Sequence, residues 1–231
     1  MATVDDPALL EGLELFAGLS REQLRALSPS LHLTAVPAGS HIITADQPGE
    51  VVYVFLSGTV KIFVSRADGR EVILAFLGPG DTVGEMSLVD SAGRSANAVT
   101  TEPSRYVWMT REAFQLCLRD HPPMAINLVR LLSHRLRFAN EQIQALATLD
   151  VPGRVARQIL ALAERYGNPA KGGEVMIPLR LTQSDLGDLV GASRERVNQA
   201  IVDFKQRGFL AVDGDHRLRV LSRRDLARYC Q

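Results

Sequence analysis

The chain has 231 residues, 46% of them hydrophobic and 23% charged, with 26 basic and 26 acidic side chains and a formal net charge of zero. This is the composition of an ordinary soluble globular protein, and the length suffices for two packed domains. With no long uncharged apolar run, an acidic N-terminal sequence (MATVDDPALLEGLELF) and two distant cysteines, we expect no membrane span, no signal or transit peptide, no disulfide scaffold and a cytoplasmic location.

Residues 7–28 are expected to form a short helical segment, in which Ser20 and Glu22 suit a first helical turn. From about residue 29 to 111 the pattern changes to short runs rich in β-branched and aromatic residues: HIIT, VVYVFL, TVKIFV and EVILAFL. Turn glycines separate these runs at near-regular intervals, and Asp68-Gly69 is a hairpin signal. The pattern predicts a β-barrel, roll or sandwich.

The segment 81–101, DTVGEMSLVDSAGRSANAVTT, interrupts the strand pattern with a short helical stretch. Gly84 and Glu85 precede that stretch, and Arg94 and Ser95 follow it. An arginine can bind two phosphate oxygens at once, backbone N–H groups and a serine hydroxyl add donors, and Glu85 can accept from a ribose hydroxyl. This set of groups suits a phosphorylated sugar. The alternative is a Glu85–Arg94 ion pair that only staples an exposed loop.

Residues 122–149 predict one long helix. Apolar side chains recur with 4-3 spacing over about three heptads, and we call these positions the seam: Ala125, Val129, Leu132, Leu136, Ala139, Ile143 and Leu146. A seam of this length favours a partner helix, for which a twofold homodimer is the commonest solution. The alternative is that the stripe packs on the chain's own barrel. Asn140 lies beside the seam. It could reach a ligand in the barrel of either subunit, or it could equally be a solvated surface amide.

Asp150-Val151-Pro152-Gly153 ends this helix, so we place a hinge and a domain boundary there. The expected parts are a β-rich domain with flanking helices (1–121), the long helix (122–149) and a C-terminal domain (150–231). Residues 1–150 contain 12 basic and 17 acidic side chains (−5), whereas residues 151–231 contain 14 and 9 (+5). A basic C-terminal part is what a phosphate-binding surface requires.

The stretch 181–204, LTQSDLGDLVGASRERVNQAIVDF, predicts two short helices around Gly191, which can take a positive φ. Thr182 opens the first helix with a capping box, Ser193 caps the second, and Gly187 is small where the helices must approach. The outward positions of the second helix share one face: Arg194, Glu195, Asn198 and Gln199. This pattern indicates a helix-turn-helix with a recognition helix. The alternative is an ordinary helical hairpin with a solvated charged face.

Other elements are expected on either side of this motif. A helix over GRVARQILALAERYG (153–167) and a short strand over VMIPLRL (175–181) precede it. After it, FLAVDGDHRLRVL (209–221) predicts two strands around Asp213-Gly214, a small wing able to touch the DNA backbone. The basic segment SRRDLARY (222–229) closes the chain as a short helix.

The whole assembly resembles the cyclic-AMP receptor protein family, the CRP/FNR regulators. GEMSLVDSAGRSANA (84–98) resembles the phosphate-binding cassette of cyclic-nucleotide domains, and LTQSDLGDLVGASRERVNQAI (181–201) resembles the family's helix-turn-helix with its Ser-Arg-Glu start. LATLDVPGRVARQIL (146–160) matches the end of the long helix and the hinge. The resemblance implies an α+β fold with an N-terminal cyclic-nucleotide-binding β-roll, a long dimerisation helix and a C-terminal winged helix-turn-helix.

The sequence has no metal-spaced His/Asp cluster, no nucleophile motif and no phosphate loop such as GxxxxGK(S/T), so we do not expect an enzyme. The function implied by the resemblance is that of a homodimeric bacterial transcription regulator. Its implied effector is cyclic AMP, with no metal, and its implied partners are pseudo-palindromic double-stranded DNA, a second copy through 122–149, and RNA polymerase. Members of the family without a cyclic-AMP response are known. The alternative is therefore the same fold acting constitutively or with another effector.

The resemblance also implies site residues. Gly84 and Glu85 would face the ribose, while Arg94 and Ser95 would hold the cyclic phosphate. On the long helix the family places polar residues against the adenine, and the matching positions are Ala139 and Asn140. Ala139 departs from the family's hydroxyl, which leaves Asn140 as the residue expected to contact the base.

On the recognition helix, Arg194 would bond guanine O6 and N7, and Glu195 would accept from a cytosine N4. Gln199 occupies a position that is basic in the familiar pattern, and glutamine pairs best with adenine, so the base preference there is expected to differ. Phosphate contacts or helix caps are expected at Thr182, Ser193 and Asn198.

Overall fold

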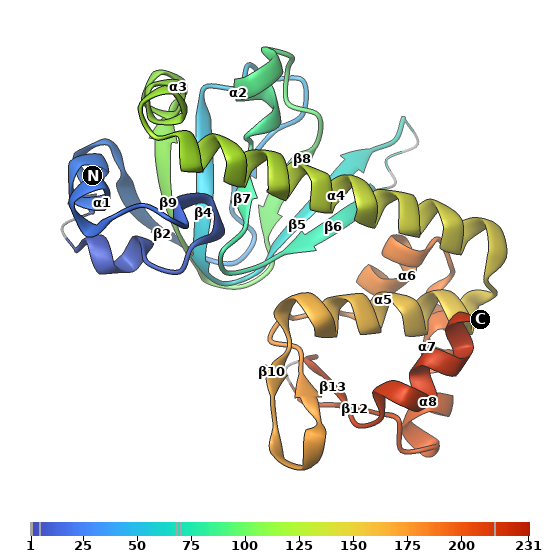
Figure 1. Ribbon diagram of the computed structural model, residues 1–231. Coiled ribbons are helices and arrows are strands. Elements are labelled where there is room, and N and C mark those ends of the chain that lie inside the picture. Colours follow the sequence, from blue (N-terminus) through green and yellow to red (C-terminus); the bar gives the residue numbers. More distant parts are fainter. Residues whose placement is uncertain (1, 5, 68, 70, 215) are drawn as a thin grey trace. The chain divides into compact units, whose positions relative to one another are not determined.

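The computed structural model describes residues 2–4, 6–67, 69, 71–214 and 216–231. Asp68, one half of the expected hairpin turn, lies outside the described residues. The chain divides into two compact units, one within residues 1–70 and 74–136 and the other within 71–73 and 137–231. The long helix α4 (Pro122–Thr148) begins in the first unit and ends in the second. Figure 1 shows the strands of the first unit and the helices α5 to α8 of the second.

Two β-sheets form the frame of the first unit. In order of pairing, the first consists of β1 (Ala2–Thr3), β2 (His32–Val36), β9 (Ser104–Thr110), β4 (Val51–Ser57) and β7 (Thr82–Val83). The second consists of β3 (His41–Ile43), β8 (Asn97–Thr100), β5 (Val60–Ser65) and β6 (Glu71–Leu77), of which residues 74–77 belong to this unit. The expected β-rich N-terminal part is therefore confirmed, and the four predicted runs are β3, β4, β5 and β6.

The central strands β4 and β9 pair in antiparallel register, with Val54 opposite Val107. Because successive side chains point to opposite faces of a strand, the pair serves two hydrophobic clusters. One cluster contains Val54 and Val107 together with the N-terminal helical residues and Phe114. The other contains Phe55 and Tyr106 and lies against β5, β7 and β8. These clusters hold the two sheets and the segment between β7 and β8 in place.

Apart from α4, the helices of the first unit are short. They are the 3-10 turns η1 (Pro7–Leu10), η2 (Glu14–Phe16) and η3 (Ser28–Ser30), and the helices α1 (Arg21–Leu27), α2 (Met86–Asp90) and α3 (Arg111–Asp120). Ser20 caps α1 with a reciprocal capping box, as its sequence predicts. Residues 7–16 are 3-10 turns and not a regular helix, because Gly12 and Gly18 adopt positive φ and interrupt the winding.

The second unit consists of helices packed on a small sheet. The helices are α5 (Val151–Tyr166), η4 (Lys171–Gly173), α6 (Gln183–Val190), α7 (Arg194–Gln206), α8 (Arg223–Ala227) and η5 (Arg228–Cys230). The sheet order is β10 (Asn168–Pro169), β11 (Val175–Met176), β13 (Leu218–Val220) and β12 (Leu210–Val212). The expected wing is thus the antiparallel pair β12–β13. The expected strand 175–181 is only two residues long, since Pro178 cannot donate to a ladder.

The break between α4 and α5 lies where the sequence predicts it. Asp150 is the N-cap of α5, and its Oδ1 accepts from the backbone N–H of Gly153 at 2.9 Å. Pro152 occupies the first turn, where the missing N–H costs nothing. Among the helices of the described residues, none combines the length and the apolar character needed to cross a membrane.

Candidate functional sites

The segment between β7 and β8, which we call the cassette (residues 84–95), contains a buried arginine. Arg94 is 8% exposed, and its Nη1 donates to the carbonyl of Gly84 at 2.8 Å and to Ser87 Oγ at 3.0 Å. Its Nη2 donates to the carbonyl of Val51 at 2.6 Å. Burial lowers the pKa of Arg94, but a guanidinium stays charged at neutral pH. The remaining N–H groups of Arg94 have no acceptor within the described part of the chain and can bind an anion.

Glu85 is 1% exposed and lies at the start of α2. Its Oε1 accepts from Arg135 Nη1 at 2.5 Å, and Arg135 Nη2 donates to the carbonyl of Thr82. Its Oε2 is buried without a hydrogen-bond partner among the described residues. The alternative of a Glu85–Arg94 ion pair is therefore wrong: backbone carbonyls hold Arg94, and Glu85 pairs with Arg135 of α4.

The backbone of the cassette requires glycine at its first position. Gly84 has a φ of +87°, and a Cβ there would lie 3.0 Å from the carbonyl oxygen of Val51 and against Arg94 Nη1. At the other end of α2, Ser91 adopts the left-handed region with a φ of 58° and stops the helix. Ser95 follows Arg94 on the exposed surface. The structure thus brings Gly84 and Arg94 into contact and leaves the Ser95 hydroxyl accessible.

The long helix α4 carries the remaining expected ligand residue. Asn140 is exposed, as is the neighbouring Ala139, and both belong to the part of α4 in the second unit. Arg135, which pairs with Glu85 across 50 residues of sequence, is not among the ligand-site residues expected from the sequence. No local pattern marks a pair so distant, and the signal was limited to a basic residue off the seam.

The seam is exposed at four of its large side chains, whereas Leu132 is half-buried and packs against the hydrophobic core of the first unit. Val129, Leu136, Ile143 and Leu146 are 63%, 64%, 65% and 54% exposed. Soluble proteins seldom expose a continuous apolar stripe, and such a stripe marks an interaction site. The alternative that the stripe packs on the chain's own barrel is wrong at these positions, because the chain leaves them uncovered.

The helix-turn-helix follows the local pattern of its sequence. Thr182 Oγ1 accepts from the backbone N–H of Asp185 at 3.1 Å, and the Asp185 carboxylate accepts from the backbone N–H of Thr182 at 3.0 Å. Gly191 ends α6 with a φ of 63°, and Ser193 caps α7. At Gly187 a Cβ would lie 2.8 Å from the carbonyl oxygen of Ala192, so only glycine allows the observed approach.

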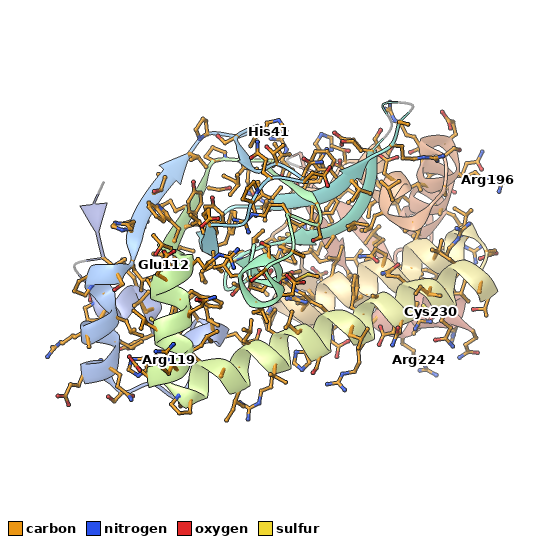
Figure 2. All side chains as sticks on the ribbon, turned by 90° about the horizontal axis from the view of Figure 1, so that it is seen from above. His41, Glu112, Arg119, Arg196, Arg224 and Cys230 are labelled. Atoms are coloured by element: carbon orange, nitrogen blue, oxygen red, sulfur yellow. The ribbon has the colours of Figure 1, made fainter. Side chains whose placement is uncertain are left out.

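The outer face of α7 is polar and free of the unit's own core. Its buried face consists of Val197, Ala200, Ile201 and Phe204. Toward its N-terminal end, α7 exposes the residues expected from the sequence, Arg194, Glu195, Asn198 and Gln199, together with Arg196. Toward its C-terminal end, Val202, Lys205 and Gln206 are also exposed. Figure 2 shows the Arg196 side chain extending away from the helix. Hydrogen bonds from its own backbone N–H and from Ser193 hold the pKa of Glu195 below its ordinary value, so Glu195 presents an anionic acceptor.

Two family models match this chain. The cyclic nucleotide-binding domain matches residues 33–121, which include the cassette, and the Crp-like helix-turn-helix domain matches residues 153–229. Both matches fall on the parts of the structure described above. They associate the cassette with a nucleotide-binding domain and α6 and α7 with a DNA-binding domain.

Relatives match over most of their length. The chain is 39% identical over 200 residues, 87% of the chain and 89% of the relative, to the CRP-like cAMP-activated global transcriptional regulator of Mycobacterium tuberculosis. FixK2 from Bradyrhizobium japonicum has the same fold, with a TM-score of 0.76 and 24% identity over 87% of this chain and 98% of that chain. The c-di-GMP responsive regulator CLP of Xanthomonas campestris is 26% identical, with a TM-score of 0.69 over 87% of this chain and 99% of that chain. The chain therefore belongs to the CRP/FNR family: it is a DNA-binding transcriptional regulator with a cyclic-nucleotide-binding domain, and not an enzyme.

Proposed function

We propose that this regulator is a homodimer whose DNA binding is controlled by cyclic AMP held at the cassette. The observation that carries the proposal is the Glu85 carboxylate, which is 1% exposed and has one oxygen without a partner in the described part of the chain. A buried unpaired acceptor costs free energy, about 1–3 kcal/mol or more when charged. A ribose hydroxyl is a donor of the right kind to remove that cost.

The other groups of the cassette suit the rest of a cyclic nucleotide. Arg94 has N–H groups left over from its protein contacts, and Ser95 has an accessible hydroxyl, so both would donate to the cyclic phosphate. Gly84 lets the backbone approach the sugar, since no side chain stands there. Asn140 is the residue of α4 proposed to contact the base.

The choice of cyclic AMP over another cyclic nucleotide has its own support. The Mycobacterium tuberculosis relative is described as cAMP-activated, and it is more similar to this chain than CLP, which is described as c-di-GMP responsive. The cassette has an acidic residue, Glu85, where it would contact a ribose, and a basic residue, Arg94, where it would contact a single phosphodiester. The alternative is control by an effector of another class, and titration with different nucleotides distinguishes it from control by cyclic AMP.

The dimer is proposed to form through the seam of α4. Its uncovered apolar side chains need a partner, and a second copy of the same helix presents the same spacing. We retain the division into 1–121, 122–149 and 150–231 as the proposed domains of each subunit. RNA polymerase is the further protein partner proposed for the DNA-bound dimer.

Ligand control is proposed to run from the cassette to α4. Glu85 contacts Arg135, so a ligand hydroxyl at Glu85 changes the surroundings of a side chain that belongs to the dimerisation helix. The same helix ends at Thr148, two residues before Asp150, the N-cap of α5. Cyclic AMP can shift the equilibrium only by binding the DNA-competent state more tightly. In that state the two recognition helices would lie roughly 34 Å apart, one turn of DNA.

Isothermal titration calorimetry of the full chain with cyclic AMP, cyclic GMP and c-di-GMP tests the effector. We expect one cyclic AMP per chain, with clearly weaker binding of the other two nucleotides. Arg94→Ala is expected to abolish binding, and Ser95→Ala, which removes only an exposed hydroxyl, to weaken it. Tighter binding of c-di-GMP, or no binding of any of the three, would refute control by cyclic AMP.

A further inference from the structure

A second arginine, outside the cassette, holds the same segments as Arg94. Arg111 is the first residue of α3, and its Nη2 donates to the carbonyl oxygens of Gly49 and Ser87, the latter at 3.0 Å. Its Nη1 lies 3.4 Å from Ser91 Oγ, and its side chain is 19% exposed. A single guanidinium therefore joins the loop before β4 to the beginning and the end of α2.

These two segments supply the acceptors that orient Arg94. In the segment 49–51, where the loop enters β4, the Gly49 carbonyl accepts from Arg111 and the Val51 carbonyl accepts from Arg94. Likewise, the Ser87 backbone carbonyl accepts from Arg111 and the Ser87 Oγ accepts from Arg94. The two guanidinium groups are thus connected through a shared pair of backbone segments.

The packing between the segments leaves little room for movement. A Cβ at Gly49 would lie 2.6 Å from Ser87 Cβ and 3.4 Å from Arg94 Cζ. The backbone N–H of Arg111 also donates to the carbonyl of Glu50 at 2.8 Å, in the middle of the same loop. A displacement of this loop or of α2 would therefore move the acceptors of Arg94.

The charge of Arg111 does not stabilise the N-terminus of α3. A cation in the first turn opposes the helix dipole, at a cost of about 0.3–1 kcal/mol. The contacts of its guanidinium are what offset that cost. One turn later on α3, Gln115 Nε2 donates to the carbonyl of Leu88 at 3.4 Å, so a second side chain of α3 contacts α2.

We propose that Arg111 is a positioning residue for the cyclic-phosphate subsite: its guanidinium fork fixes the loop 49–51 and α2, and these fix the orientation of Arg94. The inference rests on the proposed function for its ligand, the phosphodiester of a cyclic nucleotide. The fork geometry, and not the charge alone, is what the role needs, because one guanidinium reaches acceptors in two segments at once.

The test compares three variants. Arg111→Lys keeps the charge and loses the fork, Arg111→Met loses both, and Arg119→Ala removes an exposed arginine from the other end of α3 as a control (Figure 2). Hydrogen exchange at the Arg94 Nε–H group reports directly how well the Arg94 side chain is ordered. It is measured by ¹⁵N NMR of the ligand-free protein, and the Arg94→Lys variant assigns the signal. Calorimetry with cyclic AMP and cyclic GMP reports the phosphodiester affinity.

We expect Arg94 exchange to quicken several-fold, and nucleotide affinity to fall about tenfold, in both Arg111 variants, as the loss of charge-assisted hydrogen bonds predicts. Arg119→Ala should leave both unchanged. The inference would be overturned if Arg111→Lys had the same Arg94 exchange rate and the same nucleotide affinity as the wild type. This holds even if Arg111→Met fails to fold. If the wild type binds neither nucleotide, the proposed function fails, while the exchange measurement still decides whether Arg111 orders Arg94.

Discussion

Leu136→Ala tests the dimer seam without disturbing the fold of the single chain. Leu136 is 64% exposed, so the chain's own core does not depend on most of its side chain. Alanine is at least as good a helix former as leucine, so α4 itself is not weakened. The substitution should therefore weaken association and leave the folding of each subunit nearly intact.

The size of the effect follows from the exposed fraction. Complete burial of a leucine side chain contributes about 1.5–3 kcal/mol. With 64% of the residue available for burial by a partner, each copy would contribute about 1–2 kcal/mol, and twofold symmetry doubles this to about 2–4 kcal/mol per dimer. The dimer dissociation constant should rise by about 30- to 1,000-fold.

Sedimentation equilibrium over a range of protein concentrations measures this constant. Arg137→Ala is the matched control, since Arg137 is the exposed neighbour of Leu136 and lies off the seam. The control should keep the wild-type constant, and circular dichroism should show the same helix content in all three proteins. A wild type that is monomeric at micromolar concentration, or a Leu136→Ala dimer as tight as the wild type, would refute the reasoning.

Three further substitutions test the two sites. Glu85→Gln keeps the shape and loses the charge, so calorimetry should show cyclic AMP affinity reduced by about 10- to 100-fold; a change within twofold would exclude the ribose role. Arg194→Ala should cost about 1–3 kcal/mol and relax specificity at one base pair per half-site, measured by anisotropy on operator variants; equal losses on specific and random DNA would rule this out. Gly187→Val should lower the free energy of unfolding in urea by about 1–3 kcal/mol, because its Cβ meets the Ala192 carbonyl; unchanged stability would contradict the close approach.

The helix-turn-helix was predictable because its determinants are local. Thr182, Gly191 and Ser193 act within four residues of their own positions, through caps and a left-handed turn. The helix break at Asp150, the N-cap of α5, is of the same kind. The seam was also predictable from the sequence, since helical spacing fixes which side chains share a face. Only the structure could show that the chain leaves Leu136 uncovered.

The cassette was predictable in its chemistry but not in its pairing. Glu85, Arg94 and Ser95 are close in sequence, so their joint role could be expected, whereas the partner of Glu85 is Arg135, which only the fold brings near. The contacts of Arg111 with Gly49 and Ser87 depend in the same way on distant segments. The pairings of Glu85 and of Arg111 depend on which segments the fold buries together, and they cannot be predicted from the spacing of residues in the sequence.

Fluorescence anisotropy of a labelled pseudo-palindromic duplex, enriched from a random pool and titrated with the full chain with and without cyclic AMP, tests the central claim most directly. The salt concentration must be fixed, since phosphate contacts make the affinity depend on it. Random duplex and Arg94→Ala serve as controls. Cyclic AMP should tighten specific binding several-fold in the wild type and have no effect on the variant. Equal binding of the wild type in both conditions would contradict control by cyclic AMP and leave only the DNA-binding half of the account.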